Sequence, residues 1–391
     1  MKNIRDLDIK GKRLLIRVDF NVPLDQVGKV ADDTRIREAL PTIRHALREG
    51  AKVIICSHLG RPKGERKPEF SMSPAAQRLS QLLDREVKLA PDCLGEEVEK
   101  MVSALEDGGI ILLENLRFYK EETGNDPEFA KSLAGLTDIY INDAFAVSHR
   151  AHASVEGITH HVREAAAGFL LQKEMDFFHR SVSNPTRPLT AVIGGAKVSG
   201  KLEALKNMLG MVDSMIIGGA MANTFLKSRG IEVGKSLVED DLLDTAASLL
   251  KEAKEKKINL YLPVDCVAAE RFEEGCVSRV VPVQEIPRDW LALDIGPATT
   301  TLFCRALDSA RTIIWNGPMG AFEMDAYSRG TMALAQQTAT SHALSVVGGG
   351  DTVSAVYKAG WNEEMSYIST GGGAFLMLME GKELPGVTAL K

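Results

Sequence analysis

Residues 14–22 read LLIRVDFNV, and this stretch contains the pattern that decides the fold. A run of strand length, residues 14–18, is almost wholly aliphatic and passes directly into the polar side chains of Asp19 and Asn21. The same succession of aliphatic run, polar or glycine-rich break and helix-length segment returns along the whole chain. Continuous apolar runs of this length are typical of buried parallel strands in βαβ units.

The pattern predicts strands in both halves of the chain, at residues 14–18, 53–56, 110–113, 139–141, 189–193, 214–217, 312–315, 344–347 and 366–369. Amphipathic segments that suit crossover helices lie between them, at residues 35–48, 73–83, 240–256 and 327–340. We therefore predict an α/β fold with two doubly wound parallel-sheet (Rossmann-like) domains joined by a hinge helix.

The length of 391 residues also favours two domains, because one hydrophobic core rarely serves a chain of this size. Residues 165–180 are predicted to form the hinge helix, and the sequence SNPTRP at 183–188 is a turn-rich break after it. We expect the first domain to cover residues 1–172 and the second to cover residues 173–375.

Composition and charge exclude several classes of partner. Lys and Arg number 47 against 53 Asp and Glu, a net charge of −6 that argues against general binding to nucleic acid or an anionic membrane. Lys2 and Arg5 are followed by no apolar segment, and the apolar stretch 374–379 is far too short to span a bilayer, so neither a signal peptide nor a membrane span is expected. The five cysteines are scattered without metal-ligand spacing and are expected to be buried free thiols of a cytoplasmic protein.

Charged and imidazole side chains follow the predicted strands of the first half, where open parallel sheets bind ligands. They are Asp19, Asn21, His58, Arg61, Arg117, His149, Arg150 and His152. A single loop arginine is most often a solvated charge, but arginines and histidines at successive strand ends favour a ligand of phosphate or carboxylate groups. The first half therefore predicts a site for a small polyanion.

Glycines follow the predicted strands of the second half, at residues 194–195, 218–219, 317, 348–350 and 371–373. Bare backbone at helix N-termini suits a polyphosphate, whose oxygens accept N–H groups at the positive end of the helix dipole. Left-handed turns would account for some of these glycines without any ligand. Their number favours a nucleotide site in the second half.

The stretch GAKVSGK at 195–201 matches the phosphate-binding P-loop pattern, but Leu202 stands where that pattern needs Ser or Thr. We reject a P-loop ATPase and expect Lys197 and Lys201 to lie on one helical face, at spacing i and i+4. Asp351 follows three glycines and is the candidate ligand for Mg²⁺, although such an Asp is more often a helix N-cap. The absence of GxGxxG counts against a dinucleotide dehydrogenase.

Eight segments, kept in order from about residue 4 to the end, resemble the phosphoglycerate kinase family. They are RVDFNV (17–22), SHLGRPKG (57–64), ENLRF (114–118), NDAFAVSHRAHASVEG (142–157), GGAKVSGKL (194–202), WNGPMGAFE (315–323), GGGDT (348–352) and STGGGA (369–374). Departures from the family pattern are small and lie at Gly200, Ala220 and Ala321, and none of them removes a charged group to which the resemblance assigns a role.

The resemblance implies a role for each matching residue. Phosphoglycerate would be bound by Asp19, Phe20, Asn21, Arg35, His58, Leu59, Gly60, Arg61, Arg117 and Arg150. The nucleotide would be bound by Lys201, Gly219, Asn316, Glu323 at the sugar, Gly349, Gly350, Asp351 and Thr352, with Asp351 also on Mg²⁺. The catalytic set would be Arg35, Lys197, Gly371, Gly372 and Gly373. Residues 376–391 would pack back on the first domain, in a protein that is a monomer with small-molecule partners only.

The implied reaction is reversible phosphoryl transfer between 1,3-bisphosphoglycerate and ADP. Both acceptor groups are anionic at neutral pH, so neither a general base nor a covalent intermediate is needed. The catalytic task is to align two anions and neutralise the phosphoryl group, which predicts hinge closure. Two alternatives are an ATP-dependent ligase that forms an acyl phosphate and a non-catalytic protein that binds a phosphorylated metabolite.

Overall fold

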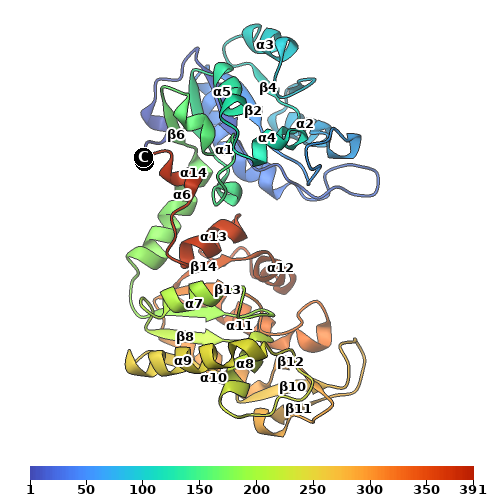
Figure 1. The fold of residues 1–391 in the computed structure, drawn as a ribbon, viewed down its shortest axis with the longest axis vertical. Coiled ribbons are helices and arrows are strands. Elements are labelled where there is room, and N and C mark those ends of the chain that lie inside the picture. Colours follow the sequence, from blue (N-terminus) through green and yellow to red (C-terminus); the bar gives the residue numbers. More distant parts are fainter. The chain divides into compact units, whose positions relative to one another are not determined.

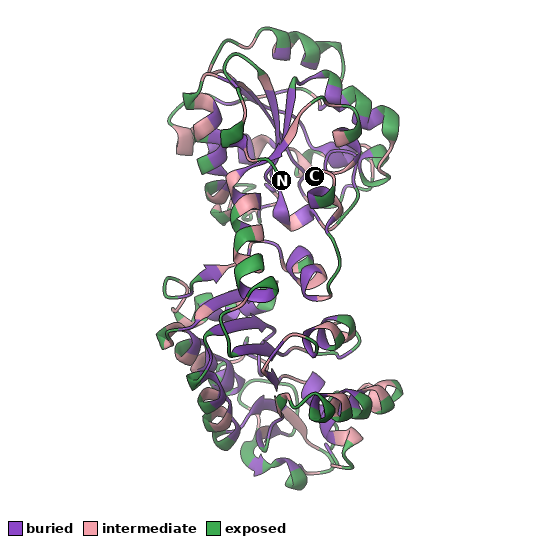
Figure 2. Cartoon of the chain, turned by 90° about the vertical axis from the view of Figure 1, so that its left-hand side faces the viewer, coloured by how far each residue is buried: buried purple, intermediate pink, exposed green.

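The computed structural model describes residues 1–391, and the chain forms two compact units (Figure 1). The first unit comprises Met1–Met175 together with Glu383–Lys391, and the second comprises Asp176–Lys382. The units divide after residue 175, where the sequence suggested 172, and the chain returns to the first unit at residue 383, where 376 was expected. In both units the central strands are buried (Figure 2).

The first unit is built on a parallel sheet of six strands in the order β3-β4-β2-β1-β5-β6. The strands are β1 (Arg13–Arg17), β2 (Lys52–Cys56), β3 (Lys88–Leu89), β4 (Ile110–Leu112), β5 (Ile139–Asn142) and β6 (Ala165–Ala167). Its helices are α1 (Thr34–Arg48), α2 (Ser73–Leu83), α3 (Glu96–Ser103), α4 (Lys120–Thr123), α5 (Pro127–Gly135) and α14 (Pro385–Thr388). The strands are aliphatic on both faces because helices and loops exclude water from both.

The C-terminal segment is attached to the first unit by two hydrogen bonds of the Gly386 backbone. The Asn142 side-chain amide donates to the Gly386 carbonyl at 2.9 Å, and the Gly386 N–H donates to the Ser148 carbonyl at 2.9 Å. A Cβ at Gly386 would lie 2.6 Å from the Val155 side chain, so the segment fits closely against the loop after β5.

The second unit has its own parallel sheet of six strands, in the order β15-β14-β13-β7-β8-β9. The strands are β7 (Leu189–Ile193), β8 (Ser214–Ile217), β9 (Asn259–Tyr261), β13 (Thr312–Asn316), β14 (Leu344–Gly348) and β15 (Tyr367–Ile368). Its helices are α7 (Leu202–Met208), α8 (Met221–Ser228), α9 (Leu243–Glu255), α10 (Pro297–Asp308), α11 (Arg329–Thr340), α12 (Gly350–Ala359) and α13 (Gly372–Met379). The two parallel sheets confirm the predicted α/β class with two doubly wound domains.

A three-stranded antiparallel sheet in the second unit was not predicted. Its order is β11-β10-β12, with β10 at Asp265–Ala269, β11 at Ser278–Pro282 and β12 at Leu291–Ile295. The edge strand β11 exposes four of its five residues, so it lacks the continuous apolar run by which buried strands are recognised.

The expected helix at 165–180 is only partly correct. Its first residues form the edge strand β6, and α6 runs from Phe169 to Phe178, followed by a wider helical turn at His179–Ser183. Three alanines carry no strand preference, so the sequence alone extended the helix backward. The helix starts where the Asp143 carboxylate accepts the N–H groups of Leu170 at 2.8 Å and Leu171 at 3.2 Å.

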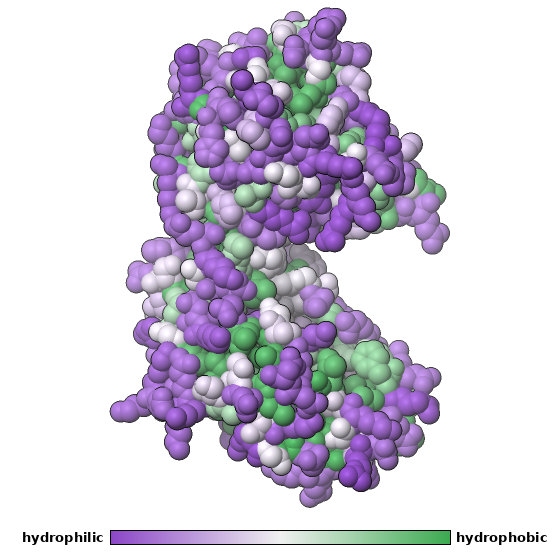
Figure 3. Space-filling view, in the orientation of Figure 1, coloured by the Kyte–Doolittle hydropathy of each residue, from purple (hydrophilic) through white to green (hydrophobic).

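Hydrophilic side chains cover most of the face shown in Figure 3. No helix in the structure is both long enough and apolar enough to cross a bilayer. All five cysteines are free thiols, but only three are buried, since Cys276 and Cys304 are partly exposed.

Candidate functional site

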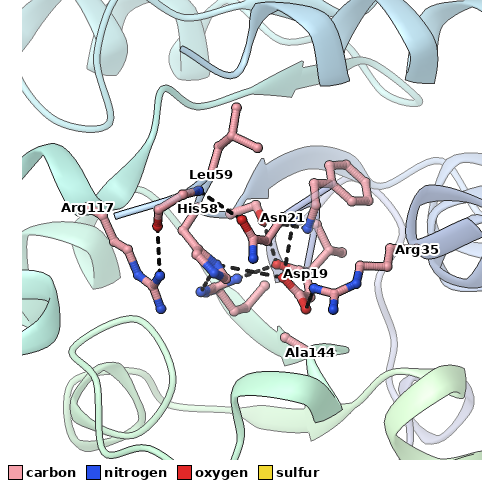
Figure 4. A network of polar contacts seen from close by, with 12 residues as sticks. Asp19, Asn21, Arg35, His58, Leu59, Arg117 and Ala144 are labelled. Atoms are coloured by element: carbon pink, nitrogen blue, oxygen red, sulfur yellow. Dashed lines mark hydrogen bonds and ion pairs between the residues drawn. The ribbon is translucent and has the colours of Figure 1, made fainter. Parts of the chain in front are cut away.

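The loops after β4, β2, β1 and β5 bring the predicted anion-binding residues of the first unit together. These four strands are neighbours in a parallel sheet, so their carboxyl ends meet at one edge. Asp19 and Asn21 follow β1, His58 follows β2, and Arg117 follows β4. Figure 4 shows these side chains within one network of polar contacts.

Arg35 is held at this edge by Asp19. Its guanidinium Nη1 donates to Asp19 Oδ2 at 2.6 Å, from the first turn of α1, and the Asn21 N–H donates to Asp19 Oδ1 at 3.2 Å. The Asp19 side chain is largely buried, whereas that of Arg35 is 40% exposed. Asp19 therefore orients a guanidinium that a ligand can still reach.

Asn21 and Arg117 fix the loop after β2. Gly60 donates its N–H to Asn21 Oδ1 at 2.8 Å, and Arg117 Nη1 donates to the Gly60 carbonyl at 2.9 Å. Phe20 and Leu59, which the family resemblance placed at the substrate, have buried side chains within the hydrophobic core. Only their backbone groups can therefore contribute to a site.

Burial and crowding of positive charge shift several pKa values at this edge. Burial, followed by the nearby Arg17 and Arg150, lowers the pKa of Arg117 to about 10. Burial and the same arginine cluster lower the pKa of His152 to about 3 and that of His58 well below its usual value. The arginines thus remain charged and both histidines are neutral at physiological pH, so the edge offers cations and neutral donors to an anion.

Arg61 and Arg150 are exposed at the same set of loops. The Arg150 Nε group donates to His149 Nε2 at 3.1 Å, and no carboxylate neutralises its guanidinium. An exposed guanidinium on a loop can move to meet the outer oxygens of a ligand, in contrast to the fixed Arg117.

Sequence reasoning missed a buried polar cluster beneath this edge. Arg17, Glu122 and Ser154 are all fully buried and contact one another. The available signal was Arg17 itself, a single charge inside the aliphatic run of residues 14–18, because a buried charge requires a partner.

The second unit contains a pocket of about 440 Å³. Three predicted nucleotide-binding residues line it, namely Gly219, Glu323 and Asp351. Much of its wall is apolar and was not foreseen, including Leu226, Leu237, Phe272, Leu293 and Met319. A mostly apolar pocket with a few polar groups at its margin suits the base and sugar of a nucleotide.

Lys201, Asn316 and Thr352 form a polar network in the same unit. Lys201 Nζ donates to the backbone and side-chain oxygens of Asn316 at 2.8 and 2.6 Å, and the Gly317 N–H donates to Thr352 Oγ1 at 2.6 Å. Burial lowers the pKa of Lys201 to about 8, and attraction to Asp351 partly opposes this shift. Burial thus disfavours the charged form of Lys201, and a phosphate anion bound nearby would stabilise that charge.

The expectation that Lys197 and Lys201 share one helical face is wrong. Residues 195–201 form bends and a turn, and α7 begins at Leu202 with Lys201 as its N-cap residue. Gly195 has a φ of 111°, a left-handed conformation that a helix does not accommodate. Lys197 is exposed, whereas the Lys201 amine is directed to Asn316.

Several of the glycines are needed by the packing of the loops themselves. A Cβ at Gly317, whose φ is 107°, would lie 2.1 Å from the Gly194 carbonyl oxygen. At Gly350, by contrast, a Cβ would meet no atom within 4 Å. Close approach of loop to loop therefore explains Gly317, while the space beside Gly350 is open to a ligand.

Asp351 lies in the first turn of α12 and its side chain is exposed. No group of three or more His, Cys, Asp or Glu side chains in the structure could hold a metal ion. A single carboxylate fits Mg²⁺ that takes its other ligands from phosphate oxygens and water, as this ion usually does. The residues do not fit a metal site built from protein ligands alone.

Two doubly wound units, one with a cationic edge and the other with a nucleoside-sized pocket, define a two-domain α/β phosphotransferase. The family model for phosphoglycerate kinase matches residues 4–382. The phosphoglycerate kinase of Geobacter metallireducens is 61% identical over 383 residues, which cover 98% of this chain and 96% of the relative. That of Desulfotalea psychrophila is 59% identical over 391 residues and the full length of both chains.

Solved structures agree with this comparison. Phosphoglycerate kinase from Coxiella burnetii superposes with a TM-score of 0.92 at 44% identity, covering 99% of this chain and 98% of the other. The enzyme from Pyrococcus horikoshii gives a TM-score of 0.83 at 31% identity, with coverage of 100% and 98%. The chain therefore belongs to the phosphoglycerate kinase family. It is a kinase, and the ligase and binding-protein alternatives are not favoured.

The buried, neutral His152 predicts a pH-dependent contribution to stability. Its pKa is lowered on folding, so the unfolded chain binds the extra proton below about pH 6.5 and the contribution is lost as the pH falls. Urea unfolding of wild type and His152→Gln at pH 7 and pH 5 should show the wild type losing on the order of 1 kcal/mol more than the variant, because solvent at the ring edge screens part of the effect. Equal losses in both proteins would contradict a neutral His152.

Proposed function

We propose that the chain catalyses reversible phosphoryl transfer from 1,3-bisphosphoglycerate to ADP, giving 3-phosphoglycerate and ATP, as a cytoplasmic monomer in glycolysis. The cluster of arginines and histidines at the carboxyl edge of the first sheet is the observation that carries this proposal. Membership of the phosphoglycerate kinase family supports it.

The first unit is proposed to bind the phosphoglycerate. Arg35 and His58 lie beside Asp19, and Arg117 and Asn21 hold the loop that contains Gly60. The exposed Arg61 and Arg150 are suited to the distal, non-reacting phosphate, because bidentate guanidinium–phosphate bonds can form without breaking an internal ion pair.

The second unit is proposed to bind the nucleotide. The 440 Å³ pocket would take the base and sugar, with Glu323 at the sugar and Gly219 beneath. The phosphates would then extend toward Lys201 and the N-terminus of α12, where Gly349, Gly350 and Thr352 present backbone N–H groups and a hydroxyl. Lys201 would exchange part of its bonding to Asn316 for a phosphate oxygen.

Magnesium is proposed to bind the nucleotide phosphates with Asp351 as its protein ligand. Bound there, the ion would neutralise phosphate charge as transfer proceeds. The exposed position of the Asp351 carboxylate supports this assignment.

The proposed transfer is direct and in line. The acceptor is already an anion, so the residues need only orient the reactants and stabilise the charge on the transferred group. Arg35 would supply that charge from the first unit and Lys197 from the second, with the backbone N–H groups of Gly371, Gly372 and Gly373 at the start of α13. The exposed Lys197 has the freedom that such a role requires.

The direct test is to incubate the purified protein with MgATP and follow ADP formation with and without 3-phosphoglycerate. ADP formation that depends on 3-phosphoglycerate is expected. Formation of ADP without it, or no formation at all, would overturn the proposed function.

Replacing either proposed catalytic cation should slow the chemical step. Arg35→Ala or Lys197→Ala is expected to lower kcat about a hundredfold, or about 2.7 kcal/mol of transition-state stabilisation. Arg37→Ala is the matched control, since Arg37 lies on the same helix in an exposed ion pair with Asp33. A near-normal kcat for Arg35→Ala at saturating substrates would show that the cation has been assigned wrongly.

Asp351→Asn keeps the shape of the side chain but removes its charge. We expect a native circular dichroism spectrum and a higher magnesium concentration for half-maximal activity at fixed ATP, because a carboxylate is the better ligand for a hard cation. Asp308→Asn, on the exposed face of α10, is the control. Identical magnesium titrations for wild type and Asp351→Asn would place the metal ligand elsewhere.

The chemistry also predicts closure around the two ligands. The reacting atoms must come within about 3–3.5 Å, while the proposed ligands bind to separately folded units. We expect a pivot at α6 and residues 183–188, and a population shift only when both ligands contribute contacts. Small-angle X-ray scattering on apo, 3-phosphoglycerate, MgADP and doubly bound samples should show the smallest radius of gyration in the last. The same radius in all four would contradict closure.

A further inference from the structure

Glu122 is a fully buried carboxylate that none of the proposed steps uses. It lies in the short helix α4, and its two oxygens accept two bonds from one residue of the loop after β5. Ser154 donates its backbone N–H to Oε2 at 2.9 Å and its hydroxyl to Oε1 at 2.6 Å. The Glu122 backbone carbonyl accepts the Ala153 N–H at 2.9 Å, so this attachment is firm.

The buried cation next to this carboxylate is Arg17. Its Nε donates to Ser154 Oγ at 2.8 Å, and its Nη2 lies 4.0 Å from Glu122 Oε1. The Ser154 hydroxyl has one proton, which goes to Glu122, so its oxygen is left to accept from Arg17. Glu122 thus holds Arg17 both by charge and through a hydrogen bond relayed by Ser154.

Arg17 in turn faces the imidazole of His58. Its Nη2 lies 3.3 Å from His58 Nδ1, the one hydrogen bond that the ring makes within the chain. A guanidinium has only donors and keeps its protons, so Nδ1 must be the acceptor. The Asp19 Oδ1 atom, at 3.7 Å from Nδ1, is too distant to compete as an acceptor for a proton there.

We propose that Glu122 is a positioning residue: by holding Arg17 against Nδ1, it fixes His58 in the neutral tautomer that has its proton on Nε2. That N–H then serves as a donor to an oxygen of the bound phosphoglycerate. The inference rests on the proposed function for the identity of the ligand. Burial and the surrounding arginines lower the pKa of His58, which agrees with a neutral ring.

The substitution Glu122→Gln tests this chain of contacts with little change in volume. The amide of Gln has one oxygen that accepts and one NH₂ group that only donates, so it cannot accept both bonds from Ser154. Its NH₂ group would face either the Ser154 N–H, which is also a donor, or the Ser154 hydroxyl, whose oxygen already accepts from Arg17 in the native protein. Ser154→Ala is a milder second variant that keeps the carboxylate and removes only the relay. Asp138→Asn is the matched control, since Asp138 pairs with Arg13 at the opposite end of β1.

Two measurements should be made on each protein. Long-range ¹H–¹⁵N NMR reports which ring nitrogen of His58 is protonated, and calorimetry gives the Kd for 3-phosphoglycerate. In wild type we expect the proton on Nε2. Glu122→Gln should give a mixture of tautomers and raise this Kd about tenfold, and Ser154→Ala about threefold, while Asp138→Asn stays within about twofold. The KM for MgATP should not change. A general loss of structure would change it, so this measurement separates a positioning role from misfolding.

Each outcome decides one question. A wild-type proton on Nδ1, or a native-like Glu122→Gln with an unchanged tautomer and unchanged Kd, would overturn the positioning role. If Glu122→Gln does not fold, Ser154→Ala is the test: an unchanged His58 tautomer and an unchanged Kd in that variant would overturn the positioning role. A wild type that does not bind 3-phosphoglycerate would overturn the proposed function instead, and the tautomer measurement would still stand.

Discussion

The carboxyl ends of parallel strands meet at one edge, and the proposed phosphoglycerate site depends on this constraint. In the register of the first sheet, Arg17 of β1 lies opposite Cys56 of β2 and Asn142 of β5. Residues at the same distance after each strand, such as Asp19 and His58, are therefore brought together although the chain separates them widely. The register of the sheet brings these residues together, so no long loop is needed to carry one residue to another.

Gathering cations in this way has an electrostatic consequence. Burial, followed by the charges of Arg17 and Arg150, lowers the affinity of Arg117 for its proton. Without a ligand, the positive side chains at this edge repel one another. A bound polyanion offsets that repulsion, so part of the binding energy comes from weaker repulsion between the protein's own cations. The proposed nucleotide site in the second unit is built differently, with open backbone beside Gly350, one half-buried ammonium and an apolar pocket.

The sequence predicted the parts of the structure that rest on continuous patterns. The strands at Leu189–Ile193 and Ser214–Ile217 and the helix at Ser73–Leu83 were predicted to the residue, because each is a clear apolar run or amphipathic period. The antiparallel sheet and the edge strands β3, β6 and β9 were missed. Strand β11 is mostly exposed, β3 and β9 contain no buried residue, and β6 consists of three alanines. Residue propensity says little about such short or exposed segments, which become strands by pairing with a neighbouring strand.

The candidate sites divide in the same way. Loop residues such as Asp19 and Arg117 were predictable because they directly follow strands, whereas Leu237 and Phe272 enter the pocket from segments that no motif marks. The helical face assigned to Lys197 and Lys201 failed because spacing was considered without the left-handed Gly195 before them. Glu122 could not be inferred, since its partner Ser154 lies 32 residues away.

Because Glu383–Lys391 belongs to the first unit, the part of the chain that is synthesised first is not the part that finishes folding first. The ribosome makes Met1–Met175 first, yet the contact between Asn142 and Gly386 can form only after all of Asp176–Lys382 has been translated. During that interval the nascent first unit lacks Glu383–Lys391, the segment that packs next to the loop bearing Arg150. A chain whose synthesis stops before residue 383 would therefore lack the segment that packs against the loop after β5.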